Sequence, residues 1–275
     1  ITNKAVFDAE VFEQLPELKY IGVLATGYNV VDLEAARQHG VVVTNVPEYA
    51  TFATDQMTMA LLLELTNLVG RHTKSVMDGD WCRSKQFCYF LSPLTELAGK
   101  TLHIIGLGKI GKRVAIMASA FGMKVTATPH DTTLIGKTID VEGTSVTCMP
   151  IEEGIKGADV VSLHCPLTED TREIINRDSL GLFKKGALLI NCARGPVINE
   201  SDVRDALDNG ILGGYGADVV CVEPMLDSNL LLGAPNCVMT PHIAWTPVET
   251  RIRLIDMAAD NLKAFMAGKP INQVN

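Results

Sequence analysis

The sequence lacks the features that mark membrane proteins and nucleic-acid-binding proteins. Its longest apolar stretches, such as residues 57–65, contain polar or charged residues and are too short to span a bilayer. Lys and Arg form no stripe, and the formal net charge is -8 at pH 7, so binding to nucleic acid has little electrostatic support. We therefore expect neither a membrane nor a nucleic acid as a partner.

The cysteines also lack a recognisable pattern. There are seven of them, an odd number, with no C-x-x-C pair and with spacings that match neither a zinc site nor a disulfide framework. We expect reduced, mostly buried cysteines in a cytoplasmic protein, and no metal site.

Short apolar strands and helices alternate in the first ninety residues or so of the chain. Residues 21–24 and 41–44 are predicted strands, and residues 32–39 between them are a predicted helix. Residues 53–77 are expected to be helical and apolar on most faces, which indicates burial. Residues 79–93 are expected to be a connection.

A second and clearer α/β unit begins near Gly99. Its alternation of strands and helices predicts a Rossmann-type, doubly wound parallel sheet. The last predicted helix, residues 247–265, is expected to return to the first domain. The predicted strands of the unit are residues 101–105, 124–128, 145–148, 160–164, 187–192, 214–219 and 237–240, and its clearest helix is 109–121.

A glycine-rich turn lies between the first strand and the first helix of this unit. It reads Gly106-Leu107-Gly108-Lys109-Ile110-Gly111, a G-x-G-x-x-G in the strand-to-helix context that the motif requires. Such glycines permit a tight turn and the close approach of a pyrophosphate, which then lies at the positive end of the helix. A turn without a ligand is the alternative, but the context favours a dinucleotide.

The second part of a dinucleotide site is less regular. An acidic residue at the end of the next strand would bind the ribose 2′-hydroxyl of NAD, but Pro129 stands there and Asp131 follows two residues later. Loss of the carboxylate removes repulsion of a 2′-phosphate, which His130 and nearby hydroxyl groups could accept, although no arginine is present. The choice between NAD and NADP stays open, with NAD favoured.

Arg194, Glu223 and His242 each come shortly after a different predicted strand. Ligands of an open parallel sheet bind outside the carboxyl ends of its strands, so all three are candidates for one cleft. Taken singly, each residue could equally be structural, as a helix cap, a solvated loop residue or a structural histidine.

The chemistry of the three residues is complementary. Arg194 can bind a carboxylate through a planar, two-pronged donor. His242 can donate a proton, since an ordinary imidazole titrates near neutrality, and Glu223 can orient that imidazole and favour its charged form. Reduction of a 2-keto acid needs this set, together with a hydride at the carbonyl carbon.

Several spaced motifs together resemble the D-2-hydroxyacid dehydrogenase family, and within it the glycerate dehydrogenase (hydroxypyruvate reductase) branch. The resemblance covers essentially the whole chain, and several motifs in one order are far more specific than any one of them. The motifs are LATGYNVVD at 24–32, residues 106–111, SLHCPLT at 162–168, NCARG at 191–195, GADV at 216–219, VEP at 222–224 and TPHIAW at 240–245.

The resemblance implies roles for individual residues. Arg194, Glu223 and His242 match the catalytic set of the family, and Arg194 also binds substrate. Thr26 and Gly27 match a loop whose backbone amides bind the substrate carboxylate. Asp218 is expected to hold the nicotinamide carboxamide, and the expected cofactor contacts together are Thr54, Gly106, Gly108, Lys109, Ile110, Gly111, Cys165, Cys192, Ala193, Asp218 and His242.

The resemblance also implies two domains and a homodimer. A dinucleotide-binding domain, residues 95–243, is inserted into a smaller, flavodoxin-like α/β substrate-binding domain made of residues 1–94 and 244–275. The dimer is expected to form through the cofactor domain and its flanking arm, residues 81–90. The chain opens on residues that resemble the interior of the family, so we expect the N-terminal part of the substrate-binding domain to be missing.

We expect an enzyme that reduces hydroxypyruvate or glyoxylate to D-glycerate or glycolate with NAD(P)H. Formate dehydrogenase shares the fold and the hydride chemistry but needs no carboxylate beside its histidine, so Glu223 disfavours it. A phosphoglycerate dehydrogenase core without its regulatory domain is another alternative, disfavoured by the end of the chain at Asn275. A non-enzymatic, dinucleotide-sensing corepressor module is a third alternative.

Cys192 could be an oxidation-sensitive thiol, but a packed small residue is the favoured interpretation.

Overall fold

The computed structural model describes residues 1–275, which form two compact units. The smaller unit consists of residues 1–53 and 245–275, and the larger unit consists of residues 54–244. None of the helices combines the length and the apolar character that crossing a membrane would need.

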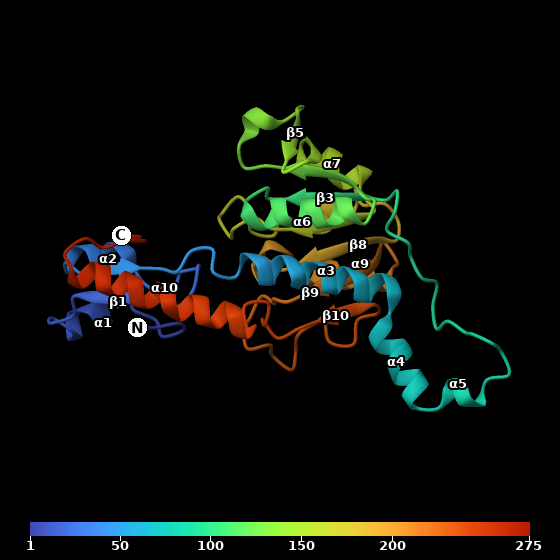
Figure 1. Ribbon diagram of the computed structural model, residues 1–275, viewed down its shortest axis with the longest axis horizontal. Helices are drawn as coiled ribbons and strands as arrows, with labels where there is room; N and C mark the ends of the chain where they lie inside the picture. The colour runs from blue at the N-terminus through green and yellow to red at the C-terminus, as the bar shows by residue number, and fades with distance from the viewer. The chain divides into compact units, whose positions relative to one another are not determined.

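An eight-stranded sheet forms the centre of the larger unit (Figure 1), in the order β10-β9-β8-β7-β3-β4-β6-β5. The strands run outward in both directions from β3, and all neighbours pair in parallel except β5 and β6, as predicted for a doubly wound sheet. The strands are β3 (Thr101–Ile105), β4 (Lys124–Thr128), β5 (Thr138–Val141), β6 (Thr144–Cys148), β7 (Val160–Leu163), β8 (Ala187–Asn191), β9 (Leu212–Ala217) and β10 (Cys237–Met239).

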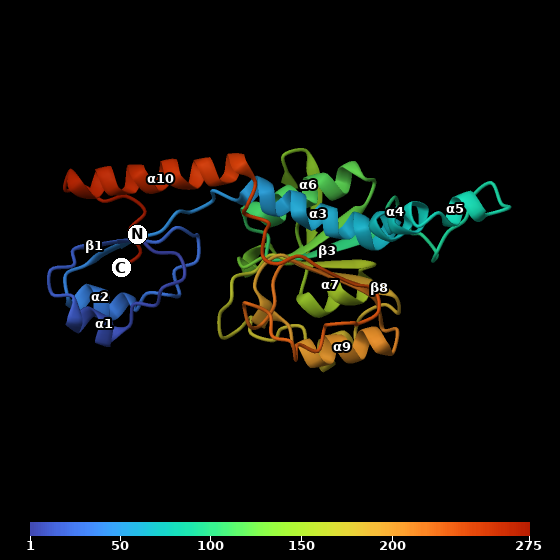
Figure 2. The same cartoon turned by 90° about the horizontal axis from the view of Figure 1, so that it is seen from below.

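Helices cover both faces of this sheet, because parallel strands are apolar on both sides (Figure 2). Two helices, α3 and α6, lie over one face, and α7 and α9 lie over the other. Helix α6 buries Gly111, Val114, Ala115 and Ala118, a spacing that places all four on one side of a helix. The bounds are α3 (Thr51–Asn67), α6 (Lys109–Ala120), α7 (Ile151–Gly157), α8 (Arg177–Leu180) and α9 (Glu200–Asp208), with short 3₁₀ turns η1 (Thr132–Leu134) and η2 (Gly195–Val197).

Helix α3 belongs to the core of the larger unit. Its residues Leu61 and Leu62 share one apolar cluster with sheet residues such as Ile104. Two glycines on β9 let the helix lie close, since a Cβ at Gly214 would be 3.0 Å from Leu65 Cδ2. The first border between the two units therefore lies after residue 53. From the sequence we predicted a first domain border after residue 94.

The helix predicted over residues 53–77 is broken in two. Helix α3 ends at Asn67 and helix α4 (Val69–Met77) begins after Leu68, whose φ of 51° is left-handed. The Glu64 carboxylate accepts a hydrogen bond from Gly70 N at 3.1 Å, just beyond the break. The break was missed because leucine favours helices and neither glycine nor proline stands at the break itself. A short helix, α5 (Asp80–Arg83), follows within the predicted connection.

The smaller unit has a parallel sheet of its own. Its strands and helices are β1 (Tyr20–Gly22), β2 (Val42–Thr44), α1 (Ala9–Gln14), α2 (Leu33–Gln38) and α10 (Val248–Met266). Phe12 and Ile21 lie in its core, and Asp32 caps α2 by accepting from Ala35 N at 2.9 Å. Leu254 and Ala258 of α10 pack against residues 46–50, which confirms that the last helix returns to the N-terminal segment.

A histidine is fully buried in the sheet of the larger unit. The ring of His103 on β3 is 2.9 Å from Thr126 Oγ1 and 3.1 Å from Thr128 Oγ1. Gly154 of α7 lies against the ring, because a Cβ there would be 2.0 Å from a ring atom. Burial lowers the pKa of His103 to about 4, so its ring is neutral at pH 7.

We predict that His103 makes stability fall in mild acid. An unfolded histidine has a pKa of about 6.5, so between that value and about 4 the unfolded chain binds a proton that the folded chain does not. The free energy of unfolding therefore decreases as the pH falls through this window. Denaturant unfolding at about pH 7 and about pH 5 should show a smaller decrease for His103→Gln than for the parent. His130→Gln, which changes an exposed histidine, is the control, and an equal decrease in all three proteins would contradict the prediction.

Candidate active site

The predicted site residues of the larger unit lie at one edge of its sheet. Because β10, β9, β8, β7 and β3 run in parallel, their carboxyl ends share that edge. Arg194 follows β8, Glu223 follows β9 and His242 follows β10. The glycine-rich turn 106–111 follows β3, and Cys165 follows β7.

Glu223 and His242 form a close hydrogen-bonded pair. His242 Nδ1 is 2.6 Å from Glu223 Oε2, and the two side chains remain 34% and 28% exposed. The carboxylate engages Nδ1 and leaves Nε2 as the ring atom available to a reactant. A carboxylate at this distance orients the imidazole through Nδ1.

A buried carboxylate holds the turn on which His242 lies. Asp218 is 2% exposed and accepts from Thr240 Oγ1 at 2.5 Å, Ile243 N at 2.8 Å and Ala244 N at 2.8 Å. His242 itself has a left-handed φ of 54°, a conformation that needs support from its surroundings. From the sequence we predicted that Asp218 binds the cofactor, and this bracing role was missed. The position of Asp218 directly after a buried strand could have indicated that its carboxylate has partners within the protein.

The loop of Arg194 is shaped by two residues that were not predicted. Asn191 donates to Arg194 O at 2.9 Å and accepts from Ala193 N at 3.0 Å. A Cβ at Gly195 would be 2.0 Å from the carbonyl of Val220, so only glycine permits this contact with the loop of Glu223. The exposed guanidinium of Arg194 donates to Ala193 O at 2.7 Å through Nη1, which leaves its other donors available to a ligand.

The glycine-rich turn between β3 and α6 fits a dinucleotide. Gly106 has a φ of 97°, and a Cβ there would be 2.6 Å from Cys165 N. A Cβ at Gly111 would be 2.3 Å from Gly106 O, so this glycine is required by the fold. Gly108 differs, since no protein atom lies within 4 Å of its Cβ position. The space beside Gly108 adjoins the N-terminus of α6, and the positive end of a helix dipole suits an anion.

Three further predicted cofactor contacts are buried, namely Thr54, Cys165 and Ala193. Their contact with a cofactor stays a prediction. Cys192 is also buried, and burial raises the pKa of its thiol to about 12. The reactive thiolate is therefore not formed at neutral pH, which favours the packed interpretation of Cys192 over the oxidation-sensitive one.

The end of β4 offers no acidic side chain that is free to turn toward a ribose. Pro129 is buried and His130 is exposed. Asp131 caps η1, since its Oδ1 accepts from Thr133 Oγ1 at 2.7 Å and from Thr133 N at 3.0 Å. These hydrogen bonds hold the pKa of Asp131 below its usual range and commit Oδ1 to the turn.

Thr26 and Gly27 lie in the smaller unit, in the loop that follows β1. Thr26 Oγ1 donates to Val46 O at 3.1 Å, and Asn45 Nδ2 donates to Thr26 O at 2.8 Å. The loop is thus held in place from the segment that follows β2, and its function in substrate binding stays a prediction.

Comparison with known proteins agrees with this geometry. The family model described as "D-isomer specific 2-hydroxyacid dehydrogenase, NAD binding domain" matches residues 59–244, more than half of the chain. The chain belongs to this family. The resemblance inferred from the sequence is confirmed, and the larger unit of this dehydrogenase, residues 54–244, nearly coincides with the matched NAD-binding domain.

Relatives and solved structures match the dehydrogenase over its whole length. A hydroxypyruvate reductase of Blautia hydrogenotrophica is 43% identical over 274 residues, covering 100% of this chain and 84% of the relative. A glycerate dehydrogenase of Methylorubrum extorquens is 42% identical, covering 99% and 83%. The crystal structure of the TT0316 protein from Thermus thermophilus superposes with a TM-score of 0.89 at 38% identity, covering 100% and 84%.

We predict that two glycines of the turn respond differently to the same added methyl group. Gly108→Ala should keep the thermal stability of the parent but weaken NADH binding about ten-fold, roughly 1.4 kcal/mol, because its Cβ would enter open space where a pyrophosphate fits. Gly111→Ala should instead lower the melting temperature, because its Cβ would meet Gly106 O. NADH fluorescence titration and thermal unfolding measure the two effects. Unchanged NADH binding in Gly108→Ala would argue against the dinucleotide site.

Proposed function

We propose that this dehydrogenase reduces hydroxypyruvate or glyoxylate to D-glycerate or glycolate with NADH or NADPH. The supporting observation is the 2.6 Å contact between His242 and Glu223, at the sheet edge that also bears Arg194 and the glycine-rich turn. The names of the two relatives, hydroxypyruvate reductase and glycerate dehydrogenase, support the substrate class.

The proposed mechanism assigns one task to each residue. Arg194 binds the carboxylate of the keto acid through its planar donors, and we propose that the backbone amides of Thr26 and Gly27 bind it as well. When bound, the reduced nicotinamide supplies the hydride for the carbonyl carbon. His242 donates the proton of Nε2 to the carbonyl oxygen, while Glu223 stabilises the charged imidazole. In the oxidation direction His242 accepts that proton.

The proposed cofactor contacts follow the geometry of the larger unit, which we assign as the dinucleotide-binding domain. The amides at Lys109 and Ile110, with Gly106 and Gly108, would hold the pyrophosphate. Asp218 would bind the nicotinamide carboxamide, because a carboxylate accepts about four hydrogen bonds and the protein uses three. The smaller unit is assigned to the substrate, and Thr54, Cys165, Cys192 and Ala193 are assigned to the cofactor.

The direct test is oxidation of NADH and of NADPH with hydroxypyruvate, glyoxylate, pyruvate and phosphohydroxypyruvate. We predict turnover with the first two substrates. His242→Ala should lower kcat about 10²–10⁴-fold and retain NADH binding.

Arg194→Lys should lower kcat/KM, because one ammonium group cannot replace the planar guanidinium fork. Glu223→Gln should lower kcat, because an amide orients the His242 imidazole less well than the carboxylate that lies 2.6 Å from its Nδ1.

The controls separate the remaining alternatives. Undiminished turnover in His242→Ala would remove this residue from proton transfer. Preference for phosphohydroxypyruvate would favour a phosphoglycerate dehydrogenase, and formate oxidation would favour a formate dehydrogenase. NADH binding without any turnover would favour a dinucleotide-sensing module.

We propose that the enzyme accepts NADPH as well as NADH. Support comes from Pro129, which stands where NAD-specific sites have an acid, and from Asp131, whose Oδ1 is engaged by Thr133. No carboxylate therefore has to be displaced by a 2′-phosphate, and His130 is exposed nearby.

Substitution at Pro129 tests this cofactor proposal. Pro129→Asp should raise the ratio of kcat/KM for NADH over NADPH about ten-fold, because the new carboxylate accepts from the ribose hydroxyl and repels a phosphate. Pro129→Asn, which has the same shape without the charge, is the matched control. Equal shifts in both variants would contradict the electrostatic explanation.

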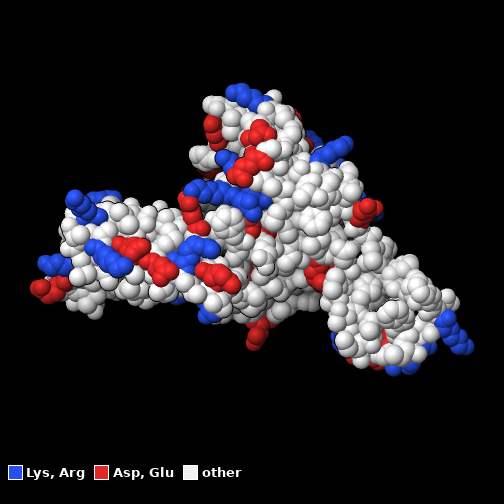
Figure 3. Space-filling model, in the orientation of Figure 1, with Lys and Arg blue, Asp and Glu red and all other residues white.

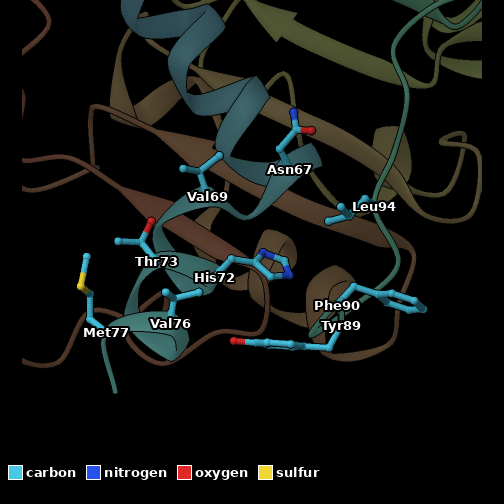
Figure 4. Close-up of a pocket in the computed structure, with 9 residues that line it drawn as sticks. All are labelled: Asn67, Val69, His72, Thr73, Val76, Met77, Tyr89, Phe90 and Leu94. Carbon is cyan, nitrogen blue, oxygen red and sulfur yellow. The ribbon is translucent and has the colours of Figure 1, made fainter. Parts of the chain in front are cut away.

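We propose that the enzyme is a homodimer whose interface includes the arm formed by α4, α5 and the segment that follows. Large apolar side chains of this arm are exposed, including Met77 at 80%, Phe87 at 92% and Phe90 at 71%. A groove of about 400 Å³ runs between α4 and the returning segment (Figure 4), where Tyr89 and Phe90 lie opposite His72 and Val76. Apolar surface gathered on one arm is typical of an interface.

We also propose a cytoplasmic location. All seven cysteines are free, and two of them, Cys82 and Cys88, are exposed on the arm. Exposed free thiols suit a reducing compartment. On the face seen in Figure 3 acidic and basic side chains are scattered among uncharged ones and form no extended basic patch, which agrees with a small-molecule substrate rather than a polyanion.

A further inference from the structure

The segment that bears Glu223 has little regular structure. Between the end of β9 at Ala217 and the start of β10 at Cys237 the chain forms bends and turns only. No backbone ladder therefore sets the position of Glu223 relative to His242. That position depends on individual contacts between this segment and its neighbours.

The carboxylate of Glu200 makes two of these contacts, one on each side of Glu223. Oε1 accepts from Cys221 N at 2.8 Å, two residues before Glu223 in the chain. Oε2 accepts from Asn229 Nδ2 at 3.0 Å, six residues after it. The two oxygens of one side chain thus bracket the turn of the catalytic glutamate.

The contacts require a carboxylate rather than an amide. Asn229 Oδ1 accepts from Leu231 N at 2.9 Å, which fixes Nδ2 as the group that faces Glu200. Both partners of Glu200 are therefore donors, and a carboxylate can accept at both of its oxygens. A glutamine has one acceptor oxygen, so its NH₂ group would face a donor on one side.

Glu200 also connects this segment to the loop of Arg194. It is the first residue of α9, which Asn199 caps by accepting from Asp202 N at 3.1 Å. The turn η2 joins α9 to the Arg194 loop, and the contact of Gly195 with Val220 brings that loop against the Glu223 segment. Glu200 therefore lies where the supports of both catalytic loops meet.

We propose that Glu200 is a positioning residue for catalysis, whose carboxylate holds residues 221–229 in the conformation that presents Glu223 to His242. The proposal rests on the proposed function, since it concerns the same proton transfer. Glu200 touches neither substrate nor cofactor in this role and acts through Glu223.

A double-mutant cycle tests the proposal. Glu200→Gln should lower kcat about ten-fold and leave the KM for NADH unchanged. In the Glu223→Gln background the same substitution should lower kcat less than two-fold, because Glu200 acts through the side chain of Glu223. Glu152→Gln is the matched control, since it makes the same change at an exposed glutamate in the first turn of another helix, α7. Equal losses in both backgrounds, or no loss in the parent background, would overturn the proposal.

Hydrogen exchange provides a readout that does not depend on turnover. The amide of Cys221 should exchange at least about ten-fold faster in Glu200→Gln than in the parent or in Glu152→Gln. Asn229→Ala, which removes the Oε2 partner together with the acceptor of Leu231 N but leaves Glu200 in place, should produce a smaller effect of the same kind and guards against misfolding of the first variant. An unchanged exchange rate of the Cys221 amide would overturn the proposal. If the amide exchanges faster in Glu200→Gln as expected but the parent protein shows no turnover, the result would count against the proposed function instead.

Discussion

Three donors converge on the buried carboxylate of Asp218, and the geometry of the sheet edge that bears the candidate site depends on that convergence. Removal of a carboxylate from water is costly unless its oxygens are hydrogen-bonded. Here a hydroxyl and two backbone amides satisfy them at 2.5–2.8 Å. The same bonds hold the left-handed backbone of His242, which places its imidazole against Glu223. Loss of the carboxylate would leave the buried amide of Ala244 unsatisfied, at about 1–3 kcal/mol, and would also remove the partner of the half-buried amide of Ile243.

The other loops of the edge follow the same principle. Strands end there, so the backbone groups of the following residues lack ladder partners and need other ones. Asn191 supplies them for the loop of Arg194, and Glu200 supplies them for the segment of Glu223. Gly195 contributes by having no side chain, because any Cβ would separate the two loops. Polar side chains that bind the loop backbones therefore help to determine where Arg194 and Glu223 lie.

Local sequence patterns predicted the central part of the fold well. The strand–turn–helix unit from Thr101 to Ala120 was predicted to within one residue, since its apolar spacing and its glycines act locally. The shared sheet edge of Arg194, Glu223 and His242 was also predicted, because each follows a recognisable strand, whereas their catalytic roles stay predictions. Tertiary contacts decided two of the features that were missed. The packing of α3 on Gly214 and the bracing by Asp218 depend on residues distant in the chain. The left-handed break at Leu68 was missed because neither glycine nor proline marks it.

The central claim is that hydride goes to the carbonyl carbon while a protein group supplies the proton to the oxygen. Reduction of hydroxypyruvate with NADH deuterated at both C4 positions tests it most directly, with product analysis by NMR and chiral chromatography. The account predicts D-glycerate with deuterium at C2, and no deuterium at C2 when unlabelled NADH is used in heavy water. Glycerate without the label at C2, or of the opposite configuration, would contradict it.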